Sequence, residues 1–173
     1  ELESDTLIET TYEGYGPGGG AVLVEVLTDN KNRAVSEIRR AFSKFGGNLG
    51  ESGCVAWIFE KKGRIEIALK ETDEDSLFDS ALDLGAEDII NEEDFFSVFT
   101  LLDNFEDVKK GLQSKGFNIS SSEISMIPSN SVKIEGKPAE HMLKMLEMLE
   151  DCDDVQNVYS NFDIDDSVIK AFA

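Results

Sequence analysis

One stretch of the chain has residue types that could hold a phosphate group. Gly14–Gly20 reads GYGPGGG, and the backbone N–H groups of such a loop can bind an anion. It lacks the Lys-Ser/Thr pair of a nucleotide-binding P-loop and leads into an apolar run, Ala21–Leu27, that predicts a strand and not a helix. We therefore expect a turn or β-bulge that requires positive φ, with Pro17 fixing one corner, and no nucleotide site.

A second group of residues could contact phosphates through positive charge. The helix expected after residue 30 carries five basic residues: Lys31, Arg33, Arg39, Arg40 and Lys44. Arg33, Arg40 and Lys44 recur with Glu37 at helical spacings of three and four residues. They therefore share a helix face that could bind nucleic acid. The alternative is a solvated face with an ion pair between Glu37 and Arg40, and the spacing alone leaves both open.

The loops beside this helix complete the candidate nucleic-acid- or ribosome-binding set, which adds Tyr15, Gly16, Gly18 and Asn48. Tyr12 and Tyr15 flank the glycine turn and could stack on a base, although aromatic residues of hairpins more often pack internally. Asn48 opens the loop Asn48–Gly53, which we expect on the same face as the glycine turn. The alternative for this loop is a flexible connector.

Catalytic and metal chemistry find no support in the sequence. His141 is the only histidine, and Cys54 and Cys152 lie 98 positions apart, so neither a zinc site nor a Cys-His pair is indicated. The acidic clusters have no EF-hand spacing and are expected to be solvated surface, or a surface that meets a basic protein partner. Met142, Met145 and Met148 form a helical stripe that predicts core packing. We expect no catalytic residue, metal or cofactor.

The charge is strongly acidic and unevenly distributed. The 173 residues contain 16 Lys/Arg and 36 Asp/Glu, a net charge of −20. Residues 1–62 hold 7 basic and 10 acidic residues (−3), and residues 63–173 hold 9 and 26 (−17). A nucleic-acid face is therefore expected in the first third. No apolar run approaches the ~20 residues of a membrane span and no signal peptide is evident, which predicts a cytoplasmic protein of bacterial type or one of an organelle matrix.

The pattern of elements predicts two domains. Residues 63–127 are expected as strand, helix, strand, strand, helix, strand, at 64–69, 73–84, 88–90, 95–101, 104–115 and 117–127. This is the ferredoxin-like order, complete within one unit. Residues 1–62 predict two strands, a helix over 31–45 with Val35, Ile38, Phe42 and Phe45 on its core face, a strand at 55–60, and a turn at Lys61-Lys62-Gly63.

The remaining residues complete the first domain. They predict a strand at 131–135, a helix at 139–150 and a closing strand at 155–162. A lone strand-helix-strand buries too little surface to be stable, so we expect it to join residues 1–62. The predicted architecture is α+β, with two ferredoxin-like (α/β plait) domains. Residues 1–62 with 128–173 form a discontinuous domain, and 63–127 form a domain inserted in it.

Long motifs spread over the whole chain resemble those of one known family. They read YEGYGPGG, LTDNKNR, FSKFGGNLGESG, FEKKG, LGAEDII, SMIP and DVQNVYSNFDI. The sequence resembles the YebC/PmpR family of probable transcriptional regulatory proteins, which is related to the mitochondrial translational activator of cytochrome c oxidase subunit I. The resemblance implies that the chain holds the second and third domains of this family without its basic, helical N-terminal domain.

The resemblance implies a non-enzymatic role in gene expression, with the ribosome and RNA, or DNA, contacted largely through that N-terminal domain. We favour the ribosome and RNA, because a fragment of charge −20 is repelled by bare duplex whereas a ribosome also offers basic proteins. A DNA-binding transcriptional regulator, in which these domains mediate dimer or partner contacts, is the alternative. A small-molecule-sensing plait or an enzyme has little support, because no base, nucleophile and orienting group occur together.

Overall fold

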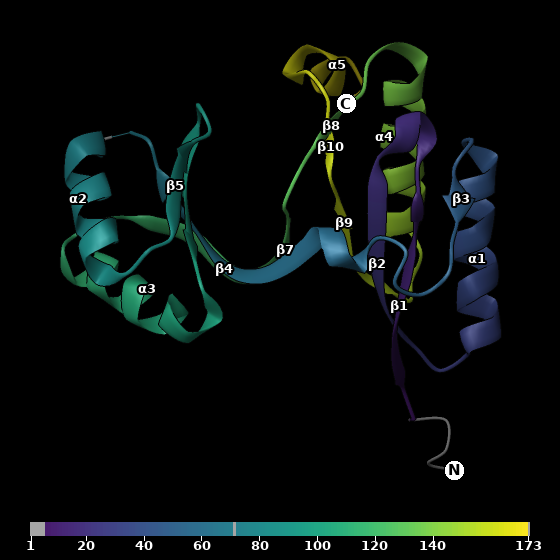
Figure 1. Cartoon of the computed structure of the whole chain (residues 1–173), viewed down its shortest axis with the longest axis horizontal. Coiled ribbons are helices and arrows are strands. Elements are labelled where there is room, and N and C mark those ends of the chain that lie inside the picture. Colours follow the sequence, from purple (N-terminus) through teal and green to yellow (C-terminus); the bar gives the residue numbers. More distant parts are fainter. Residues whose placement is uncertain (1–5, 71, 173) are drawn as a thin grey trace. The chain divides into compact units, whose positions relative to one another are not determined.

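The chain forms two compact units (Figure 1). The computed structural model describes residues 6–70 and 72–172. Residues 6–59 and 128–172 belong to the first unit, and residues 60–70 and 72–127 to the second. Each unit has its own cluster of buried apolar side chains. Each unit is therefore compact around a hydrophobic core of its own.

The first unit is built on a four-stranded sheet in the order β3-β1-β2-β9. β1 (Ile8–Tyr15) and β2 (Ala21–Thr28) form an antiparallel hairpin, joined by the 3-10 turn η2 (Pro17–Gly19). β9 (Val155–Ser160) pairs antiparallel with β2, and β3 (Asn48–Leu49) pairs with the end of β1. The almost continuous apolar sequence of β2 agrees with its burial, because Val22, Leu23 and Val24 alternate between the two faces of the strand and are all buried.

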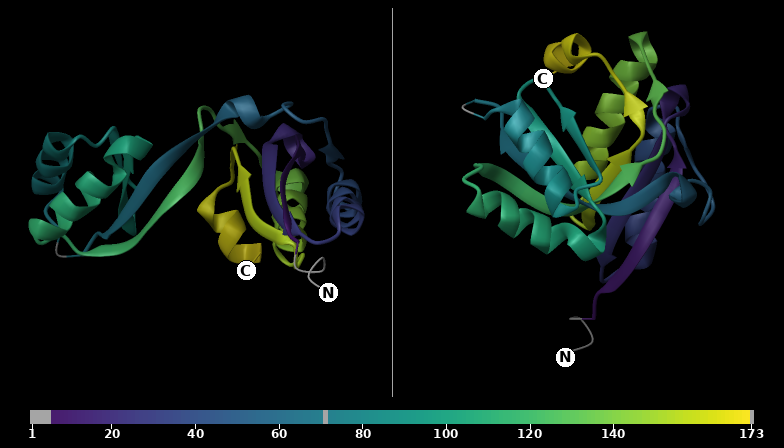
Figure 2. Two further views of the ribbon diagram at one scale, coloured as in Figure 1. Left: turned by 90° about the horizontal axis from the view of Figure 1, so that it is seen from below. Right: turned by 60° about the vertical axis from the view of Figure 1, so that its left-hand side comes forward.

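Two helices, α1 (Lys31–Lys44) and α4 (Gly136–Glu150), cover one face of this sheet (Figure 2). Side chains of β2 pack against both helices in a core that contains Val22, Val24, Val26, Ala34, Ile38, Ala41, Phe42, Ala139, Met142, Met145 and Leu149. Ile38 and Phe42 are buried as expected, whereas Val35 and Phe45 are only partly buried. Ala34 and Ala41 also face the sheet, and their small side chains allow the helix to pack close to it.

The second unit has the ferredoxin-like order, and its sheet runs β5-β6-β4-β7. Its strands are β4 (Phe59–Ala68), β5 (Asp88–Asn91), β6 (Phe95–Thr100) and β7 (Ile119–Pro128). Its helices are α2 (Glu74–Leu84) and α3 (Phe105–Ser114), preceded by the 3-10 turn η4 (Leu102–Asn104). Leu77 of α2 and Leu112 of α3 are fully buried against Ile65, Ile67 and Phe96. The predicted α+β class is confirmed.

The prediction of a turn at Lys61-Lys62-Gly63 is wrong. These residues lie inside β4, and Gly63 is paired with Thr100 of β6. A Cβ at Gly63 would lie only 2.3 Å from the Phe105 ring. Glycine is required here for close approach and not for a turn, a distinction that a single sequence does not reveal. The strand expected at 55–60 correspondingly begins only at Phe59, after the 3-10 turn η3 (Ala56–Ile58).

The predictions for the C-terminal part also need correction. The strand expected at 131–135 is reduced to β8 (Val132–Lys133), which pairs in parallel with β10 (Phe162–Asp163) outside the four-stranded sheet. The closing strand is interrupted at Asn161, which is buried and whose Oδ1 accepts the Ala21 N–H at 2.7 Å. This side-chain bond replaces a ladder bond and ends β9. A further helix, α5 (Asp166–Phe172), was not predicted.

Candidate nucleic-acid interface

The glycine turn Gly14–Gly20 uses its own backbone donors internally. The Gly16 N–H donates to the Gly20 carbonyl at 2.8 Å, and the Gly19 N–H donates to the Gly16 carbonyl at 3.0 Å. Gly18 and Gly19 have φ values of 85° and 93°, the left-handed conformation that glycine adopts without strain. The N–H groups of Gly16 and Gly19 are therefore not free to hold an anion, and the geometry is that of the expected turn.

The same turn lies against the methionines of α4. A Cβ at Gly16 would lie 2.4 Å from Cε of Met142, and one at Gly20 would lie 3.0 Å from the same atom. Met142 and Met145 are fully buried, so two members of the methionine stripe are core residues, and Met148 packs against that core. Gly16 is buried and Gly18 is exposed. Gly16 and Gly20 thus make room for Met142 of α4.

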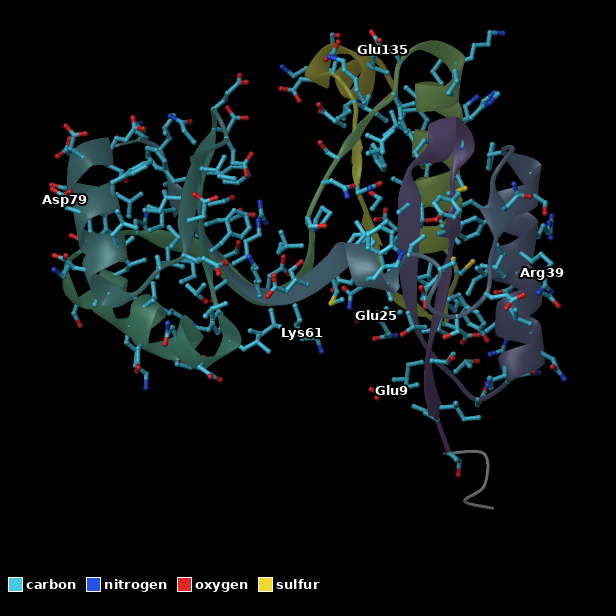
Figure 3. All side chains as sticks on the ribbon, in the orientation of Figure 1. Glu9, Glu25, Arg39, Lys61, Asp79 and Glu135 are labelled. Carbon is cyan, nitrogen blue, oxygen red and sulfur yellow. The ribbon has the colours of Figure 1, made fainter. Side chains whose placement is uncertain are left out.

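The basic residues of α1 are all exposed, but their surroundings differ. Within the described part of the chain, Lys31, Arg39 and Arg40 have no ion-pair or hydrogen-bond partner for their charged groups. Figure 3 shows Arg39 on the outer side of α1, away from β1 and β2. Lys44 lies 5.6 Å from the centre of the Phe45 ring. The Glu37–Arg40 ion pair that we considered as the alternative does not form among the described residues.

Arg33 is the exception, because two carboxylates hold its guanidinium group. Nη2 of Arg33 donates to Asp29 at 3.0 Å and to Asp154 at 2.9 Å. These hydrogen bonds, that to Asp154 above all, raise the pKa of Arg33 above its already high ordinary value. The structure thus separates Arg33 from the other cations: its charge is compensated within the first unit, whereas those of Lys31, Arg39 and Arg40 are available.

A shallow cavity of about 470 Å³ lies beside this helix. Arg33 and Arg40 line it from α1, and the acidic turn Asp151–Asp154 lines it from the other side. Cys152 also lines the cavity, but burial, together with Glu37 and the aspartates, raises the pKa of its thiol. A protonated thiol is a poor nucleophile, and the mixed charge suits neither a phosphate nor a metal ion. Among the described residues no group of His, Cys, Asp and Glu side chains could hold a metal.

The loop after β3 is fixed by a buried carboxylate that the sequence did not single out. Glu13 of β1 accepts N–H bonds from Gly53 at 2.7 Å, from Val55 at 3.0 Å and from Ala56 at 2.7 Å. Only 4% of Glu13 is exposed. Burial alone would raise the pKa of Glu13, but the three backbone donors outweigh it and hold that pKa below its ordinary value of 4.5. The segment following Asn48 is therefore ordered and not a flexible connector.

The ordered loop presents an aromatic side chain that we did not predict as a site. Trp57 in η3 is 72% exposed, and Tyr15 at the end of β1 is 41% exposed. Asn48 is exposed and pairs with Tyr15 in the β1–β3 ladder. A lone tryptophan in an apolar run reads as a core residue, so no sequence signal marks its exposure.

No helix in the described part of the chain is long and apolar enough to cross a membrane.

Fold and site together define an α+β protein of two plait-like units with a cationic helix, and among the described residues no group of side chains could hold a metal ion. The family model described as the TACO1/YebC second and third domain matches residues 7–162. The chain belongs to the TACO1/YebC family, as its motifs predicted.

Individual relatives agree with this assignment. A "Probable transcriptional regulatory protein" of Trichlorobacter lovleyi is 58% identical over 163 residues, which are 94% of this chain and 66% of the relative. A protein with the same description from Geobacter sulfurreducens is 54% identical, with 95% and 66% covered. The crystal structure of a conserved hypothetical protein from Aquifex aeolicus superposes with a TM-score of 0.84 at 43% identity, covering 96% of this chain and 69% of that one. The chain thus spans about two thirds of the length of these proteins.

Proposed function

We propose that the protein is a non-enzymatic regulator of gene expression that acts in translation, by contact of α1 with ribosomal RNA. One observation carries the proposal: Lys31, Arg39 and Arg40 lie exposed on one helix, without partners among the described residues, in a chain of charge −20. α1 itself holds five basic residues and one acidic residue, a formal charge of +4, of which the Arg33 charge is compensated by Asp29 and Asp154. A concentrated positive charge in an acidic protein favours one orientation towards a polyanion.

The stability of α1 does not account for these charges. Lys31 and Arg33 lie in the first turn, where the helix dipole disfavours cations. Asp29 and Asp154 compensate Arg33, but among the described residues nothing compensates Lys31. Lys44 at the last turn is favourably placed with respect to the dipole. The uncompensated positive charge of Lys31, at a position where it weakens the helix, supports a role in binding.

The net charge favours a ribosome over bare DNA. A chain of −20 is repelled by an isolated duplex at long range, whereas a ribosome presents basic protein segments beside its RNA. Glu74, Asp75 and Asp79 on the exposed side of α2 offer such segments a negative surface. The proposed partners are therefore ribosomal RNA for α1 and a basic protein segment for α2, in the cytoplasm or a comparable compartment.

The description carried by the relatives supports a second candidate function. They are named probable transcriptional regulatory proteins, so a DNA-binding regulator in which these two units mediate dimer or partner contacts is the alternative. Binding of the chain to ribosomes, to single-stranded RNA and to a DNA duplex of equal length, measured at one salt concentration, separates the two. Preference for the duplex would replace our proposal by the alternative.

Charge reversal tests the role of α1. The double variant R39E/R40E is expected to weaken binding to ribosomes and RNA, and to reduce the slope of log K against log salt by about 1.4 or more for two lost phosphate contacts. The matched control is K110E/K115E, which makes the same change of charge at exposed positions of the second unit. If both double variants weaken binding equally, only net charge matters and the proposed interface is wrong.

A further inference from the structure

Trp57 and Tyr15 form a fixed pair of exposed aromatic side chains. Nε1 of Trp57 donates to the carbonyl oxygen of Cys54 at 3.0 Å, and the Tyr15 hydroxyl donates to the same oxygen at 3.3 Å. The two polar ends converge on one atom, so the two rings lie next to each other although they come from different elements. With 72% of Trp57 and 41% of Tyr15 exposed, much of this aromatic surface meets solvent.

Backbone hydrogen bonds to Glu13 fix the segment that precedes Trp57. Glu13, two residues before Tyr15 and on the same face of β1, accepts the N–H groups of Gly53, Val55 and Ala56. The Cys54 N–H donates to the Glu51 carbonyl at 3.1 Å, which closes the turn. Val55 and Ile58 on either side of Trp57 are buried. The chain thus anchors the segment through its neighbours while Trp57 itself is turned outwards.

The chemistry of the pair indicates what it can bind. Its hydrogen-bonding atoms are already engaged with Cys54, so a ligand meets ring faces and not donors. Rings fixed in advance lose little conformational entropy when a planar group stacks on them. We propose that Trp57 and Tyr15 are a stacking site for unpaired nucleotide bases of single-stranded RNA.

The inference rests on the proposed function, in which α1 binds the phosphate backbone of the RNA. Lys44 ends α1 three residues before Gly47, where a Cβ would lie 2.6 Å from the Tyr15 carbonyl oxygen. Asn48 is directly paired with Tyr15. The C-terminal end of α1 and the backbone of Tyr15 therefore lie at the same end of the first unit. The Tyr15 side chain projects from the sheet face opposite α1, because its neighbour Gly14 faces Phe42 of α1. RNA bound at the last turn of α1 would pass around the short edge strand β3 to bring its bases to Trp57, and stacking accepts any base because each has a π face.

Trp57 is the only tryptophan of the 173 residues, so its fluorescence reports on this site directly. Titration of the chain with single-stranded oligoadenylate of about 12 nucleotides, a length within the usual site sizes, is expected to quench it. The same RNA as a duplex is expected to quench much less, since its bases are already stacked and paired. Affinities of Trp57→Leu and Trp57→Phe follow from the anisotropy of fluorescein-labelled RNA. Trp57→Leu is expected to bind about tenfold more weakly, and Trp57→Phe to recover part of the loss.

Several outcomes would overturn the stacking site. Unchanged affinity of Trp57→Leu, in a variant whose circular dichroism matches the wild type, shows that RNA does not use the ring. Glu51 is the only charged residue of the segment 50–58, so its substitution distinguishes an RNA ligand from a cationic peptide. Glu51→Gln is expected to strengthen the binding of RNA. The same substitution would weaken the binding of an arginine-rich peptide that is held by charge and cation–π contact. Quenching by that peptide alone assigns the surface to a protein partner. If the wild-type chain binds no RNA at all, the proposed function fails as well, whereas an effect of R39E/R40E without one of Trp57→Leu refutes only the stacking site.

Discussion

Substitution of Glu13 by glutamine tests how the loop from Asn48 to Ile58 is held. In the wild type, Oε1 of Glu13 accepts the N–H groups of Val55 and Ala56, and Oε2 accepts that of Gly53. Glutamine has nearly the same shape, and its Oε1 keeps two of the three bonds. Its NH₂ group then faces the Gly53 N–H, so two donors meet without an acceptor.

The expected loss of stability follows from these contacts. One hydrogen bond to a charged group disappears, a contribution of roughly 1.5–3 kcal/mol, and the two remaining bonds lose their charge assistance. A partly buried donor left unpaired adds to this cost. We therefore expect Glu13→Gln to lower the free energy of unfolding of the first unit by about 3 kcal/mol at neutral pH.

The effect must depend on pH with a defined sign. The pKa of Glu13 lies below its ordinary value of 4.5 in the folded chain, so the unfolded chain takes up the proton first as the pH falls. The contribution of Glu13 is complete above pH 4.5 and is lost as the pH falls from there through the folded-state pKa. The stability difference between wild type and Glu13→Gln is therefore expected to shrink in acid.

Urea unfolding at several pH values measures both quantities. Circular dichroism follows the whole chain, and Trp57 emission follows the loop itself. Glu25→Gln is the matched control, because Glu25 lies in β2 two residues from Leu23, the hairpin partner of Glu13, and accepts one exposed hydrogen bond from Asn157 at 3.1 Å. A change below about 0.5 kcal/mol is expected there. An equally small change for Glu13→Gln would refute the view that this carboxylate orders the loop.

Three further predictions concern packing. Gly63→Ala is expected to destabilise the second unit by about 1–3 kcal/mol in urea unfolding, because its Cβ would lie 2.3 Å from the buried Phe105 ring; an unchanged midpoint would contradict this. Thr100→Val is expected to be neutral or stabilising by the same measurement, because the Thr100 hydroxyl is buried without a partner among the described residues, and a marked loss would reveal a bond that we do not see. Met145→Ala is expected to cost about 2–5 kcal/mol and Met148→Ala clearly less, since Met145 is fully buried and Met148 only partly; thermal unfolding of both variants checks the order.

The fold was largely predictable because its signals are local. The order of strands and helices in residues 60–127 follows from alternation, helical spacing and Gly85 as a left-handed helix end. Gly63 misled the prediction because a glycine required for close packing and a glycine required for a turn look alike in one sequence. β8 and β10 were missed as a pair because two-residue strands leave no periodic signal.

The candidate site was predictable only in part. The positive charge of α1 could be read from residue types, but the compensation of Arg33 depends on Asp154, which lies 121 positions away. The engagement of the glycine turn with Met142 and Met145 likewise depends on the approach of α4. No local pattern encodes such contacts, so the availability of a charge or of an N–H group is decided only in three dimensions.

The sequence alone determined the class of the protein: its family motifs, its acidic charge, and a basic helix in the first third. The tertiary structure decided which of those residues are free to act. The glycine turn is hydrogen-bonded internally, and Arg33 forms an ion pair with Asp154. Glu13 is buried beneath the loop that exposes Trp57. The reason is physical, since composition and periodicity depend on neighbours in the chain, whereas exposure and pairing depend on segments that only folding brings together.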